Sequence, residues 1–158
     1  MSRSLFNERV AGWPVAVLRI AMGILWLVAV SGKLAHFSTW PDGLHGYLDA
    51  SAKTAFGFYQ GFLGFASAHY QVFAWLVPIG ELGVGIALVA GALSRFAAAV
   101  GLFMTLNFWF MKGAAFWDPQ NHDSLFIIIL FVLMCTQCGR VFGLDHWLSR
   151  RKPAWPIW

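Results

Sequence analysis

Four polar side chains interrupt otherwise apolar stretches of the chain: Arg19, Lys33, Glu81 and Asn107. Polar and charged groups are costly to bury in such surroundings, so they indicate either a function in substrate or proton handling or a buried pair that fixes helix register. Arg19 and Lys33 are fourteen residues apart, and at about 100° per residue they lie roughly 40° apart on one helix face. Glu81 and Asn107 are expected at the same depth in neighbouring helices, about 16–18 Å from the helix ends. We predict that Glu81 pairs with Asn107 or with a cation of the first helix.

Cys135 and Cys138 form a C-x-x-C pair, a spacing that suits a redox dithiol. The pair lies at the C-terminal end of a predicted helix, where the helix dipole raises the pKa of a thiol. It also falls on the predicted cytoplasmic side, where thiols stay reduced. No second C-x-x-C or nearby histidine completes a zinc site. Two small, buried, apolar cysteines are therefore favoured over a catalytic dithiol.

The polar segment 117–123 groups two carboxylates and an imidazole, those of Asp118, Asp123 and His122. One loop supplies three metal ligands at best, and Asp-Pro and Asn-His-Asp are also typical of turns. We expect no metal site and favour a turn that ends where Asp123 and Ser124 open a helix. His45 lies in another connection on the same predicted side of the molecule.

The composition is that of a membrane protein. The chain has 158 residues, of which 59% are hydrophobic and 11% charged, against about 25% charged in soluble domains. Nine Trp and fifteen Phe suit the aromatic belts at membrane interfaces. The basic residues are scattered apart from one terminal cluster at 150–152, which is typical of an anchor facing anionic lipid. We expect the lipid bilayer, and no nucleic acid, as a partner.

We predict an all-α integral membrane protein, a single four-transmembrane-helix bundle over residues 1–158, with helices at about 14–34, 72–93, 96–111 and 124–138. Arg19, about 7–8 Å deep, either reaches toward Glu81 or extends to the near membrane surface. Cleavage of the first segment as a signal peptide is disfavoured, because its apolar stretch is long and Arg19 interrupts it. Small residues at four-residue spacing predict helix-packing faces: Gly83, Ala87 and Gly91 on one helix, and Ala97, Gly101 and Thr105 on the next.

Orientation follows from the basic residues of the connections. Seven lie on the side of the termini and of a tight turn at Ser94-Arg95, and three on the other side. This places both termini in the cytoplasm and fits a bacterial inner membrane. The long outer segment 35–71 is rich in aromatic residues and glycine, so we expect it to fold onto the membrane surface or to re-enter between helices. The seven are Arg3, Arg9, Arg95, Arg140, Arg150, Arg151 and Lys152, and the three are Lys33, Lys53 and Lys112.

Several short motifs resemble the DoxX family of membrane proteins. They are Leu-Arg-Ile-Ala-Met-Gly at 18–23, Ser-Gly-Lys-Leu at 31–34, Glu-Leu-Gly-Val-Gly at 81–85, Gly-Ala-Leu-Ser-Arg-Phe at 91–96, and Gly-Arg at 139–140 followed by Gly-Leu-Asp at 143–145. The likeness covers about residues 18–148. The long outer segment, with Trp40 and Gly-Tyr-Leu at 46–48, is similar to the DoxD branch, the small subunit of thiosulfate:quinone oxidoreductase. Cys135 and Cys138 are not part of the family pattern.

The resemblance implies an oxidoreductase subunit that passes electrons from a reduced sulfur compound to quinone beside an extracytoplasmic DoxA-like or rhodanese-like subunit, or as a homo-oligomer. Glu81, Arg19 and Lys33 are the candidate catalytic residues. The candidate substrate-binding residues are Lys33, Trp40, His45, Asn107 and Arg95. Quinone is the implied electron carrier, since the sequence shows no ligand set for haem, flavin or metal.

The alternative is a non-catalytic DoxX-type module that anchors or assembles a redox or stress-response partner. A transporter is disfavoured, because the chain shows neither inverted repeats nor broken helices.

Overall fold

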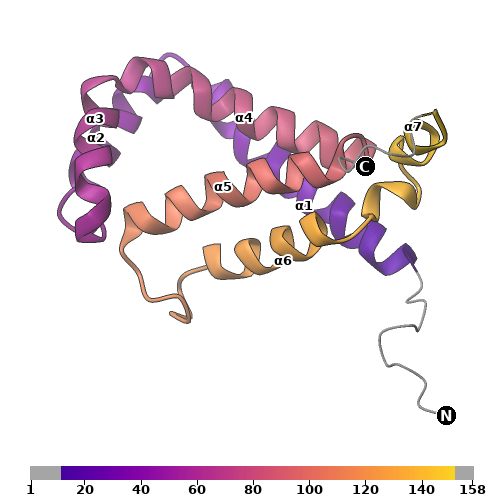
Figure 1. The fold of residues 1–158 in the computed structure, drawn as a ribbon. Coiled ribbons are helices and arrows are strands. Elements are labelled where there is room, and N and C mark those ends of the chain that lie inside the picture. Colours follow the sequence, from indigo (N-terminus) through magenta and orange to yellow (C-terminus); the bar gives the residue numbers. More distant parts are fainter. Residues whose placement is uncertain (1–11, 152–158) are drawn as a thin grey trace, which may run out of the picture.

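The computed structural model describes residues 12–151, and within them the chain is helical without strands. Arg3, Arg9 and Lys152, which enter the count of basic residues, lie outside the described residues. Four helices run alongside one another: α1 (Gly12–Ala35), α4 (Tyr70–Ala90), α5 (Ser94–Lys112) and α6 (Asp123–Cys135). Along the chain they alternate in direction, with α1 packed chiefly on α4 and α5 on α6 (Figure 1).

Two of these helices are long and apolar enough to cross a membrane. They are α1, with 24 residues, and α4, with 21. The helix α6 is apolar but has only 13 residues and ends at Cys135 instead of the expected 138. The described residues thus support two membrane spans by length and composition, and the predicted count of four remains a prediction. Large apolar side chains are exposed along α1 and α4, as expected of surfaces that face lipid: Trp13, Val17, Ile24, Val28, Val72, Trp75, Leu76 and Ile79.

The turn between α4 and α5 lies three residues earlier than predicted. Gly91 ends α4 in the left-handed conformation at φ 64°, the usual glycine signal for a helix C-terminus. The helix α5 therefore begins at Ser94, and Ser94 and Arg95 belong to the helix, not to the turn. The buried carboxylate of Asp145 accepts hydrogen bonds from the backbone N–H groups of Leu93 (2.6 Å) and Ser94 (2.9 Å). A residue far along the chain thus satisfies the N-terminus of α5.

Glycine at positions 23 and 85 allows α1 and α4 to approach closely. A Cβ atom on Gly23 would lie 2.8 Å from the backbone nitrogen of Val89, and one on Gly85 would lie 2.7 Å from the Leu27 side chain. Of the predicted packing face of α4, only Gly83 is wrong, because a Cβ there would meet nothing within 4 Å. Ala87 packs against the buried core and Gly91 is buried. The predicted face of α5 is confirmed, since its three small residues are buried: Ala97, Gly101 and Thr105.

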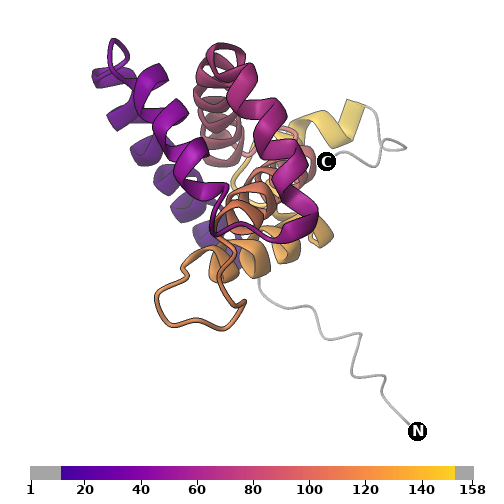
Figure 2. The same ribbon diagram turned by 90° about the vertical axis from the view of Figure 1, so that its left-hand side faces the viewer.

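The long segment 35–71 is mostly helical. It contains α2 (Trp40–Ser51), the 3-10 turn η2 (Gly57–Tyr59) and α3 (Gln60–Ala68). The helices α2 and α3 lie across the end of the molecule where α1 ends and α4 begins (Figures 1 and 2). They pack on α4 through a cluster of buried apolar residues that includes Leu44, Leu48, Leu63, Ala66 and Ala74. A second cluster, with Met22, Trp26, Val84, Leu88 and Leu130, fills the space among α1, α4, α5 and α6.

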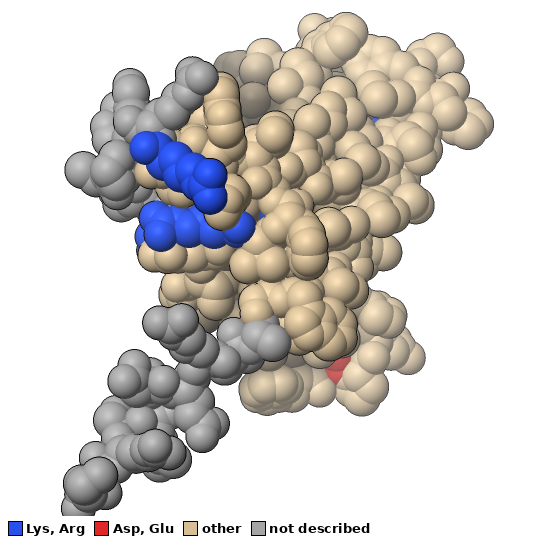
Figure 3. Space-filling model, turned by 90° about the vertical axis from the view of Figure 1, so that its right-hand side faces the viewer, with Lys and Arg blue, Asp and Glu red and all other residues tan. Residues whose placement is uncertain are grey.

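The opposite end of the molecule holds the 3-10 turn η3 (Cys138–Arg140) and α7 (Asp145–Arg151). On this end, Lys and Arg side chains gather on one part of the face, where few acidic atoms are visible (Figure 3). Arg95, Arg140 and Arg150 belong to elements at this end, whereas Lys33, Lys53 and Lys112 belong to the end with α2 and α3.

Candidate functional site

Lys33 and Glu81 form an ion pair between α1 and α4. The Nζ atom of Lys33 lies 2.8 and 2.7 Å from the two carboxylate oxygens of Glu81, which is 2% exposed. The Lys33 ammonium also lies 5.4 Å from the centre of the Trp40 ring, within the range of a cation–π contact. The prediction that Glu81 pairs with a cation of the first helix is confirmed, and that cation is Lys33.

A cavity of about 280 Å³ adjoins this pair. Residues from α1, α2, α4 and α5 line it, so the ion pair forms one wall and the N-terminal part of α2 another. Lys112 is a second cation on its lining, and it forms its own ion pair with Asp123 at 2.7 Å. The lining residues are Lys33, Trp40, Leu44, Tyr47, Val77, Glu81, Phe108, Met111 and Lys112.

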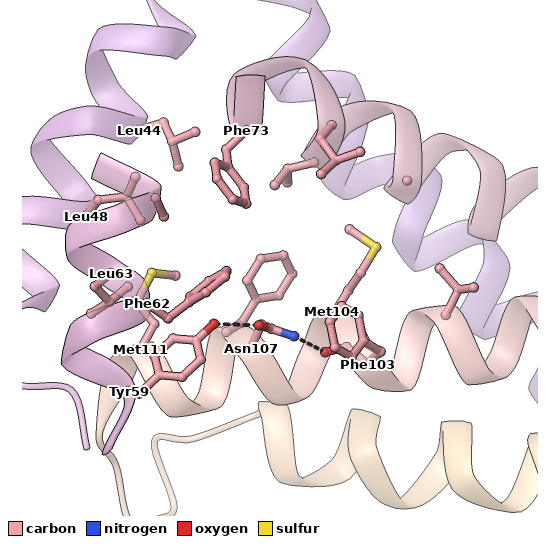
Figure 4. Close-up of a pocket in the computed structure, with 16 residues that line it drawn as sticks. Leu44, Leu48, Tyr59, Phe62, Leu63, Phe73, Phe103, Met104, Asn107 and Met111 are labelled. Atoms are coloured by element: carbon pink, nitrogen blue, oxygen red, sulfur yellow. Dashed lines mark hydrogen bonds between the residues drawn. The ribbon is translucent and has the colours of Figure 1, made fainter. Parts of the chain in front are cut away.

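A larger cavity of about 430 Å³ lies beside the first, between the α2–α3 pair and α4 and α5 (Figure 4). Four residues line both cavities, namely Leu44, Val77, Phe108 and Met111. The lining of the larger one is apolar except for Tyr59 and Asn107. Its volume is within the range of about 300–1,000 Å³ that is usual for small-molecule sites.

Asn107 does not bond to Glu81, so that part of the prediction is wrong. Its side-chain oxygen accepts a hydrogen bond from the Tyr59 hydroxyl, and its amide nitrogen donates to the carbonyl of Phe103 at 2.6 Å. Depth along two helices does not define the direction in which each side chain points, and Asn107 points to the larger cavity. Tyr59 is a site residue that was not predicted from the sequence, although it carries the one hydroxyl among the aromatic residues of 56–65.

Arg19 lies at the other end of α1 and neither reaches Glu81 nor extends to the surface. It is fully buried and donates hydrogen bonds to the backbone carbonyls of Cys138 and Phe142, each at 3.1 Å. The Arg19 guanidinium fits only because two neighbouring residues are glycines. A Cβ atom would lie 2.2 Å from its Nη1 atom if placed on Gly91, and 2.5 Å from it if placed on Gly143. Arg19 therefore joins α1 to the segment after α6, apart from the two cavities.

Two other candidate residues also lie away from the ion pair. Arg95 is at the start of α5, and its Nε donates to the carbonyl of Met134 at 3.0 Å. His45 is on α2 but lines neither cavity: its ring stacks on Tyr70 at 4.5 Å between centroids, and its Nε2 lies 3.7 Å from Asp49. Of the proposed substrate-binding residues, the structure brings Lys33 and Trp40 together at the smaller cavity and places Asn107 at the larger.

Cys135 and Cys138 are both free thiols. Cys138 is buried, as expected, but Cys135 is exposed, on the same face of α6 as the exposed Ile128, Phe131 and Val132. Burial raises the pKa of the Cys138 thiol, which disfavours the thiolate that a catalytic dithiol needs.

The loop 113–122 has the hydrogen bonds of a turn. Asp118 accepts a bond from the backbone of Gln120 at 2.9 Å, and the Asn121 side chain accepts one from the backbone of Asp123 at 3.2 Å. The predicted helix start at Asp123 is confirmed.

The described residues form an all-helical bundle with exposed apolar flanks, and two of its helices are long and apolar enough to cross a membrane. The sequence profile of the DoxX family matches residues 15–113, from the first turn of α1 to the end of α5. The chain therefore belongs to the DoxX family, which is membrane-associated. No curated protein and no solved structure matches the chain.

Proposed function

We propose that this DoxX-family protein is the membrane subunit of an oxidoreductase that passes electrons from a reduced sulfur compound, such as thiosulfate, to quinone. The observation that carries the proposal is the Lys33–Glu81 pair on the wall of a cavity that adjoins a larger, apolar one. The two cavities differ in chemistry, because three charged side chains lie on the lining of the smaller one and none on that of the larger one. An anionic donor and a lipid-soluble acceptor need such different surroundings.

The smaller cavity supplies groups for an anion and for protons. Lys33 and Lys112 offer ammonium groups and Trp40 an aromatic wall. Joining two thiosulfate ions through a new S–S bond releases two electrons, and a quinone takes up two electrons and two protons to form quinol. The carboxylate of Glu81 forms an ion pair with the Lys33 ammonium group. When a substrate anion replaces this carboxylate as the partner of Lys33, Glu81 is positioned to accept and hold a proton.

We propose further that both termini are cytoplasmic and that the protein lies in a bacterial inner membrane. In this orientation α2, α3 and both cavities face outward, so that an extracytoplasmic DoxA-like or rhodanese-like subunit can deliver the sulfur compound. The bias of the basic residues toward the end with η3 and α7 supports the orientation.

The second candidate is a non-catalytic DoxX-family module that anchors or assembles a partner. The specific observation in its favour is that the Lys33–Glu81 pair also joins α1 to α4, which is what a purely structural ion pair would do.

Substitution of Lys33 by alanine separates the two candidates. In lipid vesicles that contain the purified protein, we expect Lys33→Ala to lower thiosulfate-dependent quinone reduction by an order of magnitude or more. Loss of a desolvated charged partner costs about 2–5 kcal/mol, whereas a screened surface charge contributes about 0–1 kcal/mol. The matched control is Lys53→Ala, at an exposed position after α2.

The measurement is the absorbance change on quinone reduction, with and without thiosulfate. Equal rates for the two folded variants would assign Lys33 a structural role. No thiosulfate-dependent reduction by the unchanged protein, alone or with its outer partner, would favour the non-catalytic module.

A further inference from the structure

The larger cavity contains one polar pair, formed by Tyr59 and Asn107. Tyr59 is 9% exposed, and its hydroxyl donates to the Asn107 side-chain oxygen (Figure 4). Burial raises the pKa of Tyr59 to about 12, so the hydroxyl keeps its proton at neutral pH and remains a donor. The Asn107 amide has two hydrogens, and one of them is bonded to the carbonyl of Phe103. The other has no acceptor among residues 12–151 and is free to bond to a ligand.

Exposed apolar residues line the same cavity on its outer side. Phe62 of α3 is 41% exposed, Leu76 of α4 is 57% exposed and Phe103 of α5 is 67% exposed. Further exposed apolar side chains continue this surface along both helices, including Trp75, Ile79 and Phe96. In a membrane protein such a surface faces hydrocarbon, so the cavity opens sideways to the bilayer between α4 and α5.

We infer that the larger cavity binds a lipid-soluble ring that carries a carbonyl oxygen, which enters sideways from the bilayer and accepts a hydrogen bond from the Asn107 amide. Tyr59 is a positioning residue, because its hydroxyl fixes the Asn107 side chain. The lining includes no charged residue among its sixteen members, which excludes an ionised head group on grounds of desolvation. That the ligand is a quinone rests on the proposed function. The new element is that the quinone binds in the larger cavity, with a hydrogen bond from the Asn107 amide to its carbonyl oxygen.

Binding without turnover tests the inference. Decylubiquinone is titrated into the full-length protein in lipid nanodiscs, and binding is followed by quenching of tryptophan fluorescence. We expect Asn107→Leu to weaken binding about three- to tenfold, the effect of one hydrogen bond, and Tyr59→Phe to weaken it less. The matched control is Tyr70→Phe, because Tyr70 lines neither cavity. Decylbenzene, which lacks a carbonyl, should compete poorly.

Infrared spectroscopy gives a readout that a merely structural role would not change. The carbonyl stretch of bound decylubiquinone should shift to lower frequency in the unchanged protein and lose that shift in Asn107→Leu. Should Asn107→Leu not fold, Asn107→Ser also removes the amide donor. Gly80→Leu places a large side chain in the cavity, because Gly80 lies on its lining. Gly80→Leu should abolish binding.

The two proposals fail differently. Equal affinity and an unchanged carbonyl frequency in folded Asn107→Leu would overturn the inference, even where thiosulfate still drives quinone reduction. Binding that depends on Asn107, without thiosulfate-driven reduction by the unchanged protein, would uphold the inference and reject the proposed function.

Discussion

A carboxylate as buried as that of Glu81 is stable only while its partner stays in place. Both of its oxygens face the Lys33 ammonium group, which is itself only 21% exposed at the side chain. Removal of one partner leaves an uncompensated charge in low-dielectric surroundings, and removal of both leaves an apolar contact. The two changes therefore have very different energetic consequences.

We predict that Lys33→Met and Glu81→Leu each lower the free energy of unfolding by about 3 kcal/mol. The double variant should lose less than either single variant, because no charge remains buried. The measurement is equilibrium unfolding in mixed micelles with increasing SDS. Losses that simply add in the double variant would show that the two side chains do not interact.

The sequence limited the partner of Glu81 to Asn107 or a cation of the first helix, and the structure selects Lys33. It did not predict the surroundings of Asn107. Lys33 and Glu81 meet because the lysine lies on the inward face of α1 and has a long side chain. The neighbour of Asn107, Tyr59, lies in the short 3-10 turn η2, and nothing in the sequence brings η2 against α5. The second cavity was unpredictable for the same reason.

At the level of elements, the contact between α1 and α4 depends on the absence of a side chain at Gly23. Two backbone atoms of α4 limit the space there: the nitrogen of Val89 at 2.8 Å and the carbonyl oxygen of Gly85 at 3.0 Å from an added Cβ. Backbone atoms cannot move aside as a flexible side chain can, so even one methyl group must separate the helices.

We expect Gly23→Ala to destabilise the protein by about 1–3 kcal/mol, the usual range for an overpacked core. Gly32→Ala is the matched control on the same helix, because a Cβ at Gly32 would meet nothing within 4 Å. Alanine has the higher helix propensity, by about 1 kcal/mol, so the control should be neutral or stabilising. Thermal unfolding in detergent compares them, and similar midpoints for the two variants would contradict the packing argument.

Element boundaries were predictable where a local signal exists. Pro14 and the apolar run locate α1, and Asp123 opens α6 as expected. The turn after α4 was placed too late, because Gly91 was assigned to a packing face instead of a helix end. The carbonyl of Gly91 accepts a hydrogen bond at 2.8 Å from the backbone N–H of Asp145, which lies about fifty residues further along the chain. Gly91 is the local signal for this helix end, whereas the contact with Asp145 could not be predicted from neighbouring residues.

For the whole molecule, the basic residues divide between the two ends of the bundle, and this division predicts its orientation. We expect a cysteine placed at Ala52, which is exposed after α2, to react with a membrane-impermeant maleimide in intact cells. A cysteine at Ser149, on α7, should react only after the membrane is opened. Both variants need Cys135→Ser, because Cys135 is exposed.

Labelling of position 149 in intact cells, without labelling of position 52, would invert the proposed topology. It would also place the two cavities on the cytoplasmic side and remove the extracytoplasmic partner from the proposal.

The length of α6 has a consequence for the surrounding lipid. Its 13 residues span about 20 Å, whereas the hydrocarbon core of a bilayer is about 30 Å thick. When α6 lies across the bilayer, the hydrocarbon layer next to it must become thinner. The layer beside α1, which has 24 residues, need not. The protein then favours membranes with shorter acyl chains. Association of two copies along α6 reduces the amount of lipid that must be thinned.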